Sequence, residues 1–184
     1  MNKPDGFLPK FGGYKKLLSY QRSLVVFDAT VNFCNGYFKK FDRTVDQMVQ
    51  AARSGKQNII EASMASGTSK ETEIKLTNVA RASLEELLED YRVILREIKA
   101  DEWPKDHAYA LRLRKLNKTL DANYETFRKG VENKDLAIRV NVIIGLIKVT
   151  SFYLHRQILS LEAEFLKTGG MREAMTKARR QAKK

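Results

Sequence analysis

Apolar side chains recur every three or four positions along most of this chain, which is the spacing of one face of an α-helix. The pattern is most regular over residues 69–100, and it also predicts long helices over residues 14–41, 44–66 and 135–168. Residues 104–133 carry a thinner apolar stripe among many charged positions. We interpret that segment as one or two helices packed on the outside of the main body.

Glycines and hydroxyl residues mark where two of these helices end or begin. Gly36 weakens the first helix by about 1 kcal/mol relative to alanine, so a bend or an early end is expected there. Gly67 lies between the second and third helices. Either Thr68 or Ser69 can cap the third helix, and Thr68 with Glu71 has the S/T-x-x-E spacing of a capping box.

Similar signals predict the remaining boundaries. Asp42 or Thr44 can cap the second helix, and Asn133 or Asp135 can cap the last long one. Pro104 suits the first position of a helix, because the amide hydrogen that proline lacks has no partner there.

These elements together predict an all-α protein, an up-and-down four-helix bundle with an extra helical insertion at about 104–133 and a short basic C-terminal helix. We expect residues 1–13 to be an N-terminal extension, residues 14–168 to be the bundle and residues 169–184 to be a basic tail. The last long helix is apolar around much of its circumference near residues 140–149. It therefore either sits centrally or packs against another subunit.

Composition agrees with one folded domain. The chain has 184 residues, and 43% of them are hydrophobic, which is enough to build a core. The single cysteine, Cys34, excludes an internal disulfide and a cysteine-based zinc site, and its place in the apolar stripe predicts core packing.

The sequence predicts a cytoplasmic protein that does not span a membrane. No apolar run follows the charges at the N-terminus, so we expect no signal peptide. The most apolar stretch, residues 136–161, is interrupted by charged residues and falls short of the ~20 apolar residues of a membrane helix.

The net charge of +12 is unevenly distributed. Residues 57–104 hold 6 Lys and Arg against 10 Asp and Glu, whereas residues 167–184 hold 7 against 1. Such asymmetry favours either a polyanionic partner or a tail that only aids solubility. A membrane-surface role for the tail has less support, because few of its residues are apolar.

Catalytic and metal-binding patterns are absent from the sequence. Gly12 and Gly13 precede a helix but lack the Lys-Ser/Thr of a phosphate-binding loop. The acidic group Glu85, Glu86 and Glu89 has no Glu-x-x-His motif to accompany it, so a solvated face is the better interpretation. We therefore expect no enzyme activity, no cofactor and no metal.

Three short motifs carry a resemblance to a known family. They are Asn58-Ile59-Ile60-Glu61-Ala62, Ser69-Lys70-Glu71 and Ser83-Leu84-Glu85-Glu86-Leu87. In these motifs the chain resembles the bacterial four-helix-bundle proteins encoded in intervening sequences of 23S ribosomal RNA genes, with Ala62 where that family usually has glycine. The C-terminal half is similar to a subgroup with a suffix, through residues 124–128, 153–157 and 169–175.

The family is also similar to the accessory protein of diversity-generating retroelements, a basic pentamer that binds nucleic acid. The resemblance thus implies a homo-oligomer, most simply a pentamer, without enzymatic activity. It marks six residues as structural or interface positions: Asn58, Glu61, Ser69, Glu71, Ser83 and Glu86. For Asn58 and Glu61 we favour a structural role at the helix end over a partner contact, because small residues surround them.

Three groups of basic residues are candidates for phosphate contacts. They are Lys39, Lys40 and Arg43; Arg112, Arg114, Lys115 and Lys118; and Lys177, Arg179, Arg180, Lys183 and Lys184. The resulting hypothesis is an oligomeric accessory protein that binds nucleic acid or a nucleoprotein partner without strong sequence specificity. The alternative is a structural or protein–protein adaptor that binds no nucleic acid. Groups that converge on one face favour the first, and scattered groups favour the second.

Overall fold

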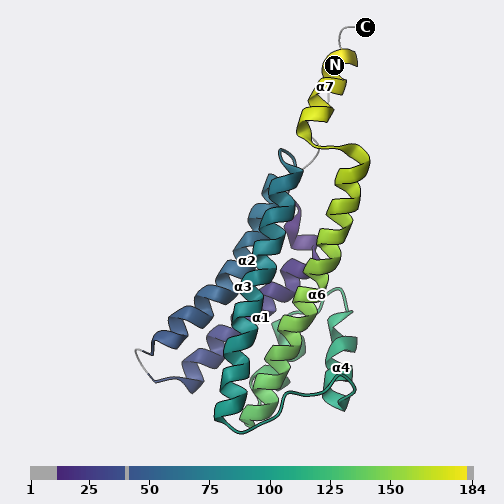
Figure 1. The fold of residues 1–184 in the computed structure, drawn as a ribbon. Helices are drawn as coiled ribbons and strands as arrows, with labels where there is room; N and C mark the ends of the chain where they lie inside the picture. The colour runs from purple at the N-terminus through teal and green to yellow at the C-terminus, as the bar shows by residue number, and fades with distance from the viewer. Residues whose placement is uncertain (1–11, 40–41, 182–184) are drawn as a thin grey trace.

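The computed structural model describes residues 12–39 and 42–181, and every regular element within them is helical (Figure 1). The elements are a 3-10 turn, η1 (Tyr14–Lys16), and helices α1 (Leu18–Tyr37), α2 (Arg43–Ala65), α3 (Lys70–Glu97), α4 (Ala108–Asn117), α5 (Tyr124–Val131), α6 (Leu136–Thr168) and α7 (Met171–Gln181). The all-α prediction is confirmed.

The four longest helices pack together into a bundle. α1 contacts α2, α2 contacts α3, α3 contacts α6, and α6 contacts α1. The two short helices α4 and α5 pack against α6 from outside, and α7 extends beyond the far end of the bundle (Figure 1). The insertion predicted at 104–133 is therefore two helices on the surface of the main body.

The middle of α6 is deeply buried in the bundle. Ile143, Leu146 and Ile147 are fully buried in a single core that also contains Phe33 and Tyr91. Because α6 contacts α1, α3, α4 and α5, it needs apolar side chains around most of its circumference. The prediction of a central position for this helix is confirmed.

α6 also has the length and composition of a membrane helix, alone among the helices described. An 18-residue window within Leu136–Lys167 has a mean hydropathy of 1.5, and 44% of that window is buried in the protein. The core helix of a bundle meets the same criterion, and here α1, α3, α4 and α5 pack against α6 and cover part of its apolar surface.

Side-chain caps start three of the long helices and decide between the predicted alternatives. The Asp42 carboxylate accepts a hydrogen bond from the Thr44 amide at 2.9 Å, so Asp42 caps α2. Asp135 caps α6 through the Ile138 amide at 3.2 Å. In α3 the cap is Ser69, as described below.

Some predicted boundaries differ from the structure. The first helix begins at Leu18 rather than at residue 14, because the backbone is extended at Leu17 and residues 14–16 form the separate turn η1. It ends at Tyr37 rather than at residue 41, one residue after the weak helix former Gly36, where the sequence predicts a bend or an early end.

Pro104 does not open a helix. The amide of Trp103 donates a hydrogen bond to the Asn141 side chain at 2.8 Å, which holds this part of the connection against α6. The chain then makes a turn at residues 105–106, with the His107 amide bonded to the Pro104 carbonyl at 3.1 Å, before α4 begins at Ala108.

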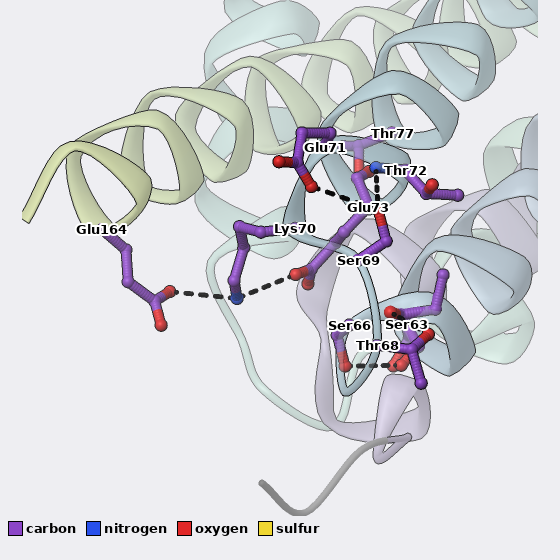
Figure 2. Close-up of polar contacts among 11 residues, drawn as sticks. Ser63, Ser66, Thr68, Ser69, Lys70, Glu71, Thr72, Glu73, Thr77 and Glu164 are labelled. Carbon is purple, nitrogen blue, oxygen red and sulfur yellow. Dashed lines mark hydrogen bonds and ion pairs between the residues drawn. The ribbon is translucent and has the colours of Figure 1, made fainter. Parts of the chain in front are cut away.

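Ser69 caps α3, and Thr68 does not. The Ser69 hydroxyl accepts a hydrogen bond from the Thr72 amide at 3.1 Å, whereas the Thr68 hydroxyl donates to the carbonyl of Ala65 at 3.2 Å (Figure 2). We expect Ser69→Ala to lower the free energy of unfolding by about 1 kcal/mol. Thr68→Ala should change it by less than about 0.5 kcal/mol. Urea denaturation followed by circular dichroism measures both, and equal losses in the two variants would contradict the assignment.

Candidate nucleic-acid interface

α4 carries one of the three predicted basic groups, and all of its four cations lie within the described residues. Arg112, Arg114 and Lys115 on the helix, and Lys118 at its C-terminal cap, are all exposed. Within the described ranges none of the four forms an ion pair with a carboxylate, unlike Arg92 and other paired cations. Their charges are therefore available to an external anion.

Close packing at one glycine positions α4 on α6. Leu113, only 6% exposed, lies over Gly145, where an added Cβ would come within 2.2 Å of the Leu113 Cδ2 atom. Any side chain larger than hydrogen at this glycine would therefore force the Leu113 side chain to move from its place on α6. With Leu113 and Asn117 facing inward, the basic side chains of α4 face outward.

A buried arginine fixes the segment that follows α4. Arg22 on α1 is fully buried, and its guanidinium donates hydrogen bonds to the carbonyls of Asn117 at 2.9 Å, Ala122 at 2.6 Å and Thr119. The Asn117 carbonyl also accepts a hydrogen bond from the Tyr153 hydroxyl at 3.1 Å. Arg22 was not among the residues predicted from sequence. The sequence feature that could have predicted its burial is its position four residues after Leu18, within an otherwise apolar stripe of the first helix.

An apolar groove of about 540 Å³ runs between α4 and α6. Its walls include Trp103, Leu113, Ile144, Val149 and Phe152. Four basic residues also line it: Lys105, Arg114, Lys118 and Lys148. Only two of these were sequence candidates, because Lys105 lies in the α3–α4 connection and Lys148 on α6, and only the fold brings them beside α4.

One carboxylate in the groove wall is already neutralised. Glu102 pairs with Lys148 and with Arg92, whose Nε lies 2.9 Å from the carboxylate. Burial alone would raise the pKa of Glu102, but the hydrogen bonds from these two cations outweigh it and lower the pKa. Lys105, Arg114 and Lys118 have no such partner among the described residues, so the rim of the groove is positive.

The other two predicted basic groups lie elsewhere. Lys39 and Arg43 are exposed where α1 ends and α2 begins, at the lower left of Figure 1, while α4 lies at the lower right. Arg179 and Arg180 are exposed on α7, above the bundle. A single chain thus does not bring the three groups onto one face. Lys40, Lys183 and Lys184 lie outside the described residues, and Lys177 is placed only as part of α7.

Two of the family-motif residues join α2 to α3. The amide of Asn58 donates hydrogen bonds to the carbonyl and hydroxyl of Ser54, at 2.9 and 3.2 Å, and the Ser54 hydroxyl lies 3.0 Å from that of Ser83. Nearby, an added Cβ at Gly55 would come within 2.9 Å of Leu84. This contact is part of tight helix packing, as the structural interpretation of Asn58 expects.

Ser69 and its neighbours tie the start of α3 to the end of α6. Lys70 lies between Glu73, at 2.9 Å, and Glu164 of α6, at 3.3 Å (Figure 2). Glu71 is exposed and accepts a hydrogen bond from the Ser69 hydroxyl at 3.2 Å. The remaining motif residues, Glu61 and Glu86, are exposed on the surfaces of α2 and α3.

Neither a reactive thiol nor a metal-binding cluster is found in the described part of the chain. Cys34 is 1% exposed, and burial raises the pKa of its thiol to about 11, so it remains protonated in the core. No group of three or more His, Cys, Asp or Glu side chains in residues 12–39 and 42–181 is arranged to hold an ion.

Comparisons of the chain with protein-family models, curated proteins and solved structures give no match. The resemblance to the intervening-sequence proteins therefore remains a prediction from the three short motifs.

Proposed function

We propose that this protein is a non-enzymatic accessory protein that binds nucleic acid, or a nucleoprotein partner, through the basic surface of α4. The observation that carries the proposal is the set of four exposed cations on and after α4, Arg112, Arg114, Lys115 and Lys118, without ion-pair partners in the described chain. A surface that neutralised only its own carboxylates would pair these side chains, as Arg92 and Arg128 are paired.

The mechanism is neutralisation of phosphates. Each lysine or arginine that contacts a phosphate releases a condensed counterion, and this release supplies affinity that falls as salt rises. The basic side chains of α4 contact phosphates in this proposal, and phosphate contacts carry no base information. The binding is accordingly without strong sequence specificity.

The proposed form is an up-and-down four-helix bundle that assembles into a homo-oligomer, a pentamer by resemblance. The bundle order is supported by the cyclic packing of α1, α2, α3 and α6. Assembly is supported by an apolar stripe on α6, where Phe152, Leu159 and Leu166 are 57%, 47% and 84% exposed and seven residues apart. That is the spacing of a helix that packs on another helix.

Assembly would also bring separated basic groups together. Repeating the α4 surface around a ring gives a long polyanion several contacts at once, and the effective concentration raises the overall affinity. Light scattering on the purified protein gives the number of subunits, and a monomer would remove this part of the proposal.

The adaptor remains the second candidate function, and one observation favours it. The three basic groups are separated in a single chain, at the α1–α2 junction, on α4 and on α7 (Figure 1). An adaptor needs no convergence of charge, and the α6 stripe offers it a partner surface. Nucleic-acid binding that depends on α4 distinguishes the two functions.

The test is fluorescence anisotropy of labelled duplex DNA, single-stranded DNA and structured RNA at several salt concentrations. In the variant with Arg112, Arg114, Lys115 and Lys118 all changed to glutamine, we expect affinity to fall by about tenfold to a hundredfold. The slope of log affinity against log salt should become shallower by about 0.9 for each lost duplex contact.

A control variant removes the same charge from another surface. It replaces four exposed cations of α2 and α3 by glutamine: Arg53, Lys75, Arg81 and Arg96. If both variants lose affinity equally, binding follows total charge and not α4. If the wild-type protein binds none of the polymers at low salt, the adaptor takes the place of the proposed function.

A further inference from the structure

We infer that the groove between α4 and α6 is a binding site for an anionic amphiphile, a single molecule with a carboxylate or phosphate head and an unbranched apolar tail. This inference does not rest on the proposed function. The groove has a volume of about 540 Å³, within the range of small-molecule sites in proteins.

The walls of the groove suit an alkyl chain. Leu113, Ile144 and Val149 line it together with Pro104 and Phe152, and Phe152 is 57% exposed. Each methylene that such a tail buries removes apolar surface from water on both the ligand and the wall. Leu113 and Ile144 are already packed in the core, so the side chains that gain apolar partners are the exposed Phe152 and the half-buried Val149.

The rim of the groove suits an anionic head. Lys105, Arg114 and Lys118 surround it without ion-pair partners in the described chain, while Glu102 is occupied by Lys148 and by Arg92. An anion at this rim meets three unpaired cations beside an apolar surface, where charge interactions are less screened than in open water. A cationic or neutral head gains nothing from this arrangement.

An alkyl tail fits the walls better than a nucleotide base does. The uncharged polar side chains in the wall are already engaged: the side-chain amide of Asn141 bonds to Trp103, Asp101 and Ala137, and the hydroxyl of Tyr153 bonds to Asn117. A base that entered would leave its own polar edge without partners, whereas a hydrocarbon chain has no polar groups to satisfy.

Trp103 reports directly on the groove, because it is the only tryptophan in the chain and lines the site. We would titrate the full-length protein with octanoate, decanoate and dodecanoate below their micelle concentrations and record Trp103 emission. Saturable binding is expected, and affinity should rise about fourfold for each added methylene until the groove is full. Dodecyl phosphate should also bind, while dodecyltrimethylammonium should not.

Variants locate the ligand in the groove. Ala110→Phe fills the groove from α4 and should weaken dodecanoate binding at least about tenfold, whereas Ala108→Phe, outside the groove on the same helix, should not. The double change Arg114→Glu and Lys118→Glu removes the positive rim and should weaken binding by about tenfold. Lys115→Glu, an exposed neighbour outside the groove, should leave it within about twofold.

Three results would overturn the inference: no saturable change with dodecanoate, equal binding by Ala110→Phe and wild type, or binding that is independent of the charge of the head. If oligothymidylate changes Trp103 emission and dodecanoate does not, the groove is a nucleic-acid site instead. Anisotropy of the Ala110→Phe variant with labelled DNA separates the two proposals, because that variant keeps all four cations of the α4 surface.

Discussion

Replacement of Arg22 by methionine is expected to lower the free energy of unfolding by about 4 kcal/mol, which corresponds to a fall in Tm of about 12 °C for a chain of this size. Methionine keeps much of the volume of arginine but donates no hydrogen bonds. The carbonyls of Thr119 and Ala122, which Arg22 holds in the structure, then lose their partner. The Asn117 carbonyl keeps only the Tyr153 hydroxyl.

The expected loss of stability arises because the Arg22 guanidinium donates hydrogen bonds to several carbonyls at once. Its planar donors reach carbonyls on both sides of the α4–α5 connection, a geometry that a lysine ammonium cannot reproduce. Arg22→Lys should therefore lose at least half as much stability as Arg22→Met. Arg53→Met, an exposed change on α2, is the control and should stay within about 0.5 kcal/mol of wild type.

Thermal and urea denaturation followed by circular dichroism measure these losses. Hydrogen exchange should also show faster exchange of residues 118–123 in Arg22→Met, before the bundle itself opens. If Arg22→Met melts within about 2 °C of wild type, the carbonyls find water or other donors, and Arg22 does not hold this connection.

The long helices could be predicted from sequence because each one follows a local rule. The apolar stripe of α3 and the cap at Ser69 depend only on neighbouring positions, so their spacing is readable along the chain. The path of the chain at Trp103 and Pro104, in contrast, depends on a contact with a distant residue. Asn141, whose side chain bonds to the Trp103 amide, lies 38 residues away in the sequence, and no local pattern predicts this contact.

The candidate site divides in the same way. Arg114 and Lys118 were found because they lie four residues apart on one helix face. Lys105 and Lys148 were not, since they join the site only after α4 folds back against α6. The apolar groove itself has no sequence signature, because its walls come from the α3–α4 connection and from two helices, α4 and α6. These two helices pack closely where Gly145 has no side chain to meet Leu113.

A leucine in place of Gly145 is expected to lower the free energy of unfolding by about 2 kcal/mol. The new Cβ alone would lie 2.2 Å from the buried Leu113 Cδ2 atom, so the Leu113 side chain must leave its position between α4 and α6. The gain of about 1 kcal/mol from removing a glycine inside a helix opposes this loss but does not cancel it. Gly36→Leu is the control, because a Cβ there meets only the Arg139 guanidinium, at an ordinary 3.5 Å.

The decisive measurement is the effect of Leu113→Ala in two backgrounds, the wild type and the Gly145→Leu variant. In the wild type, Leu113→Ala removes a buried side chain and should cost about 2 kcal/mol. In the Gly145→Leu variant, the same change removes the clash and should raise stability, because the introduced leucine occupies the vacated volume. This reversal of sign is a coupling energy between the two sites, obtained from urea denaturation of the four proteins. Additive losses of stability would show that the packing of α4 on α6 does not depend on the contact between Leu113 and Gly145.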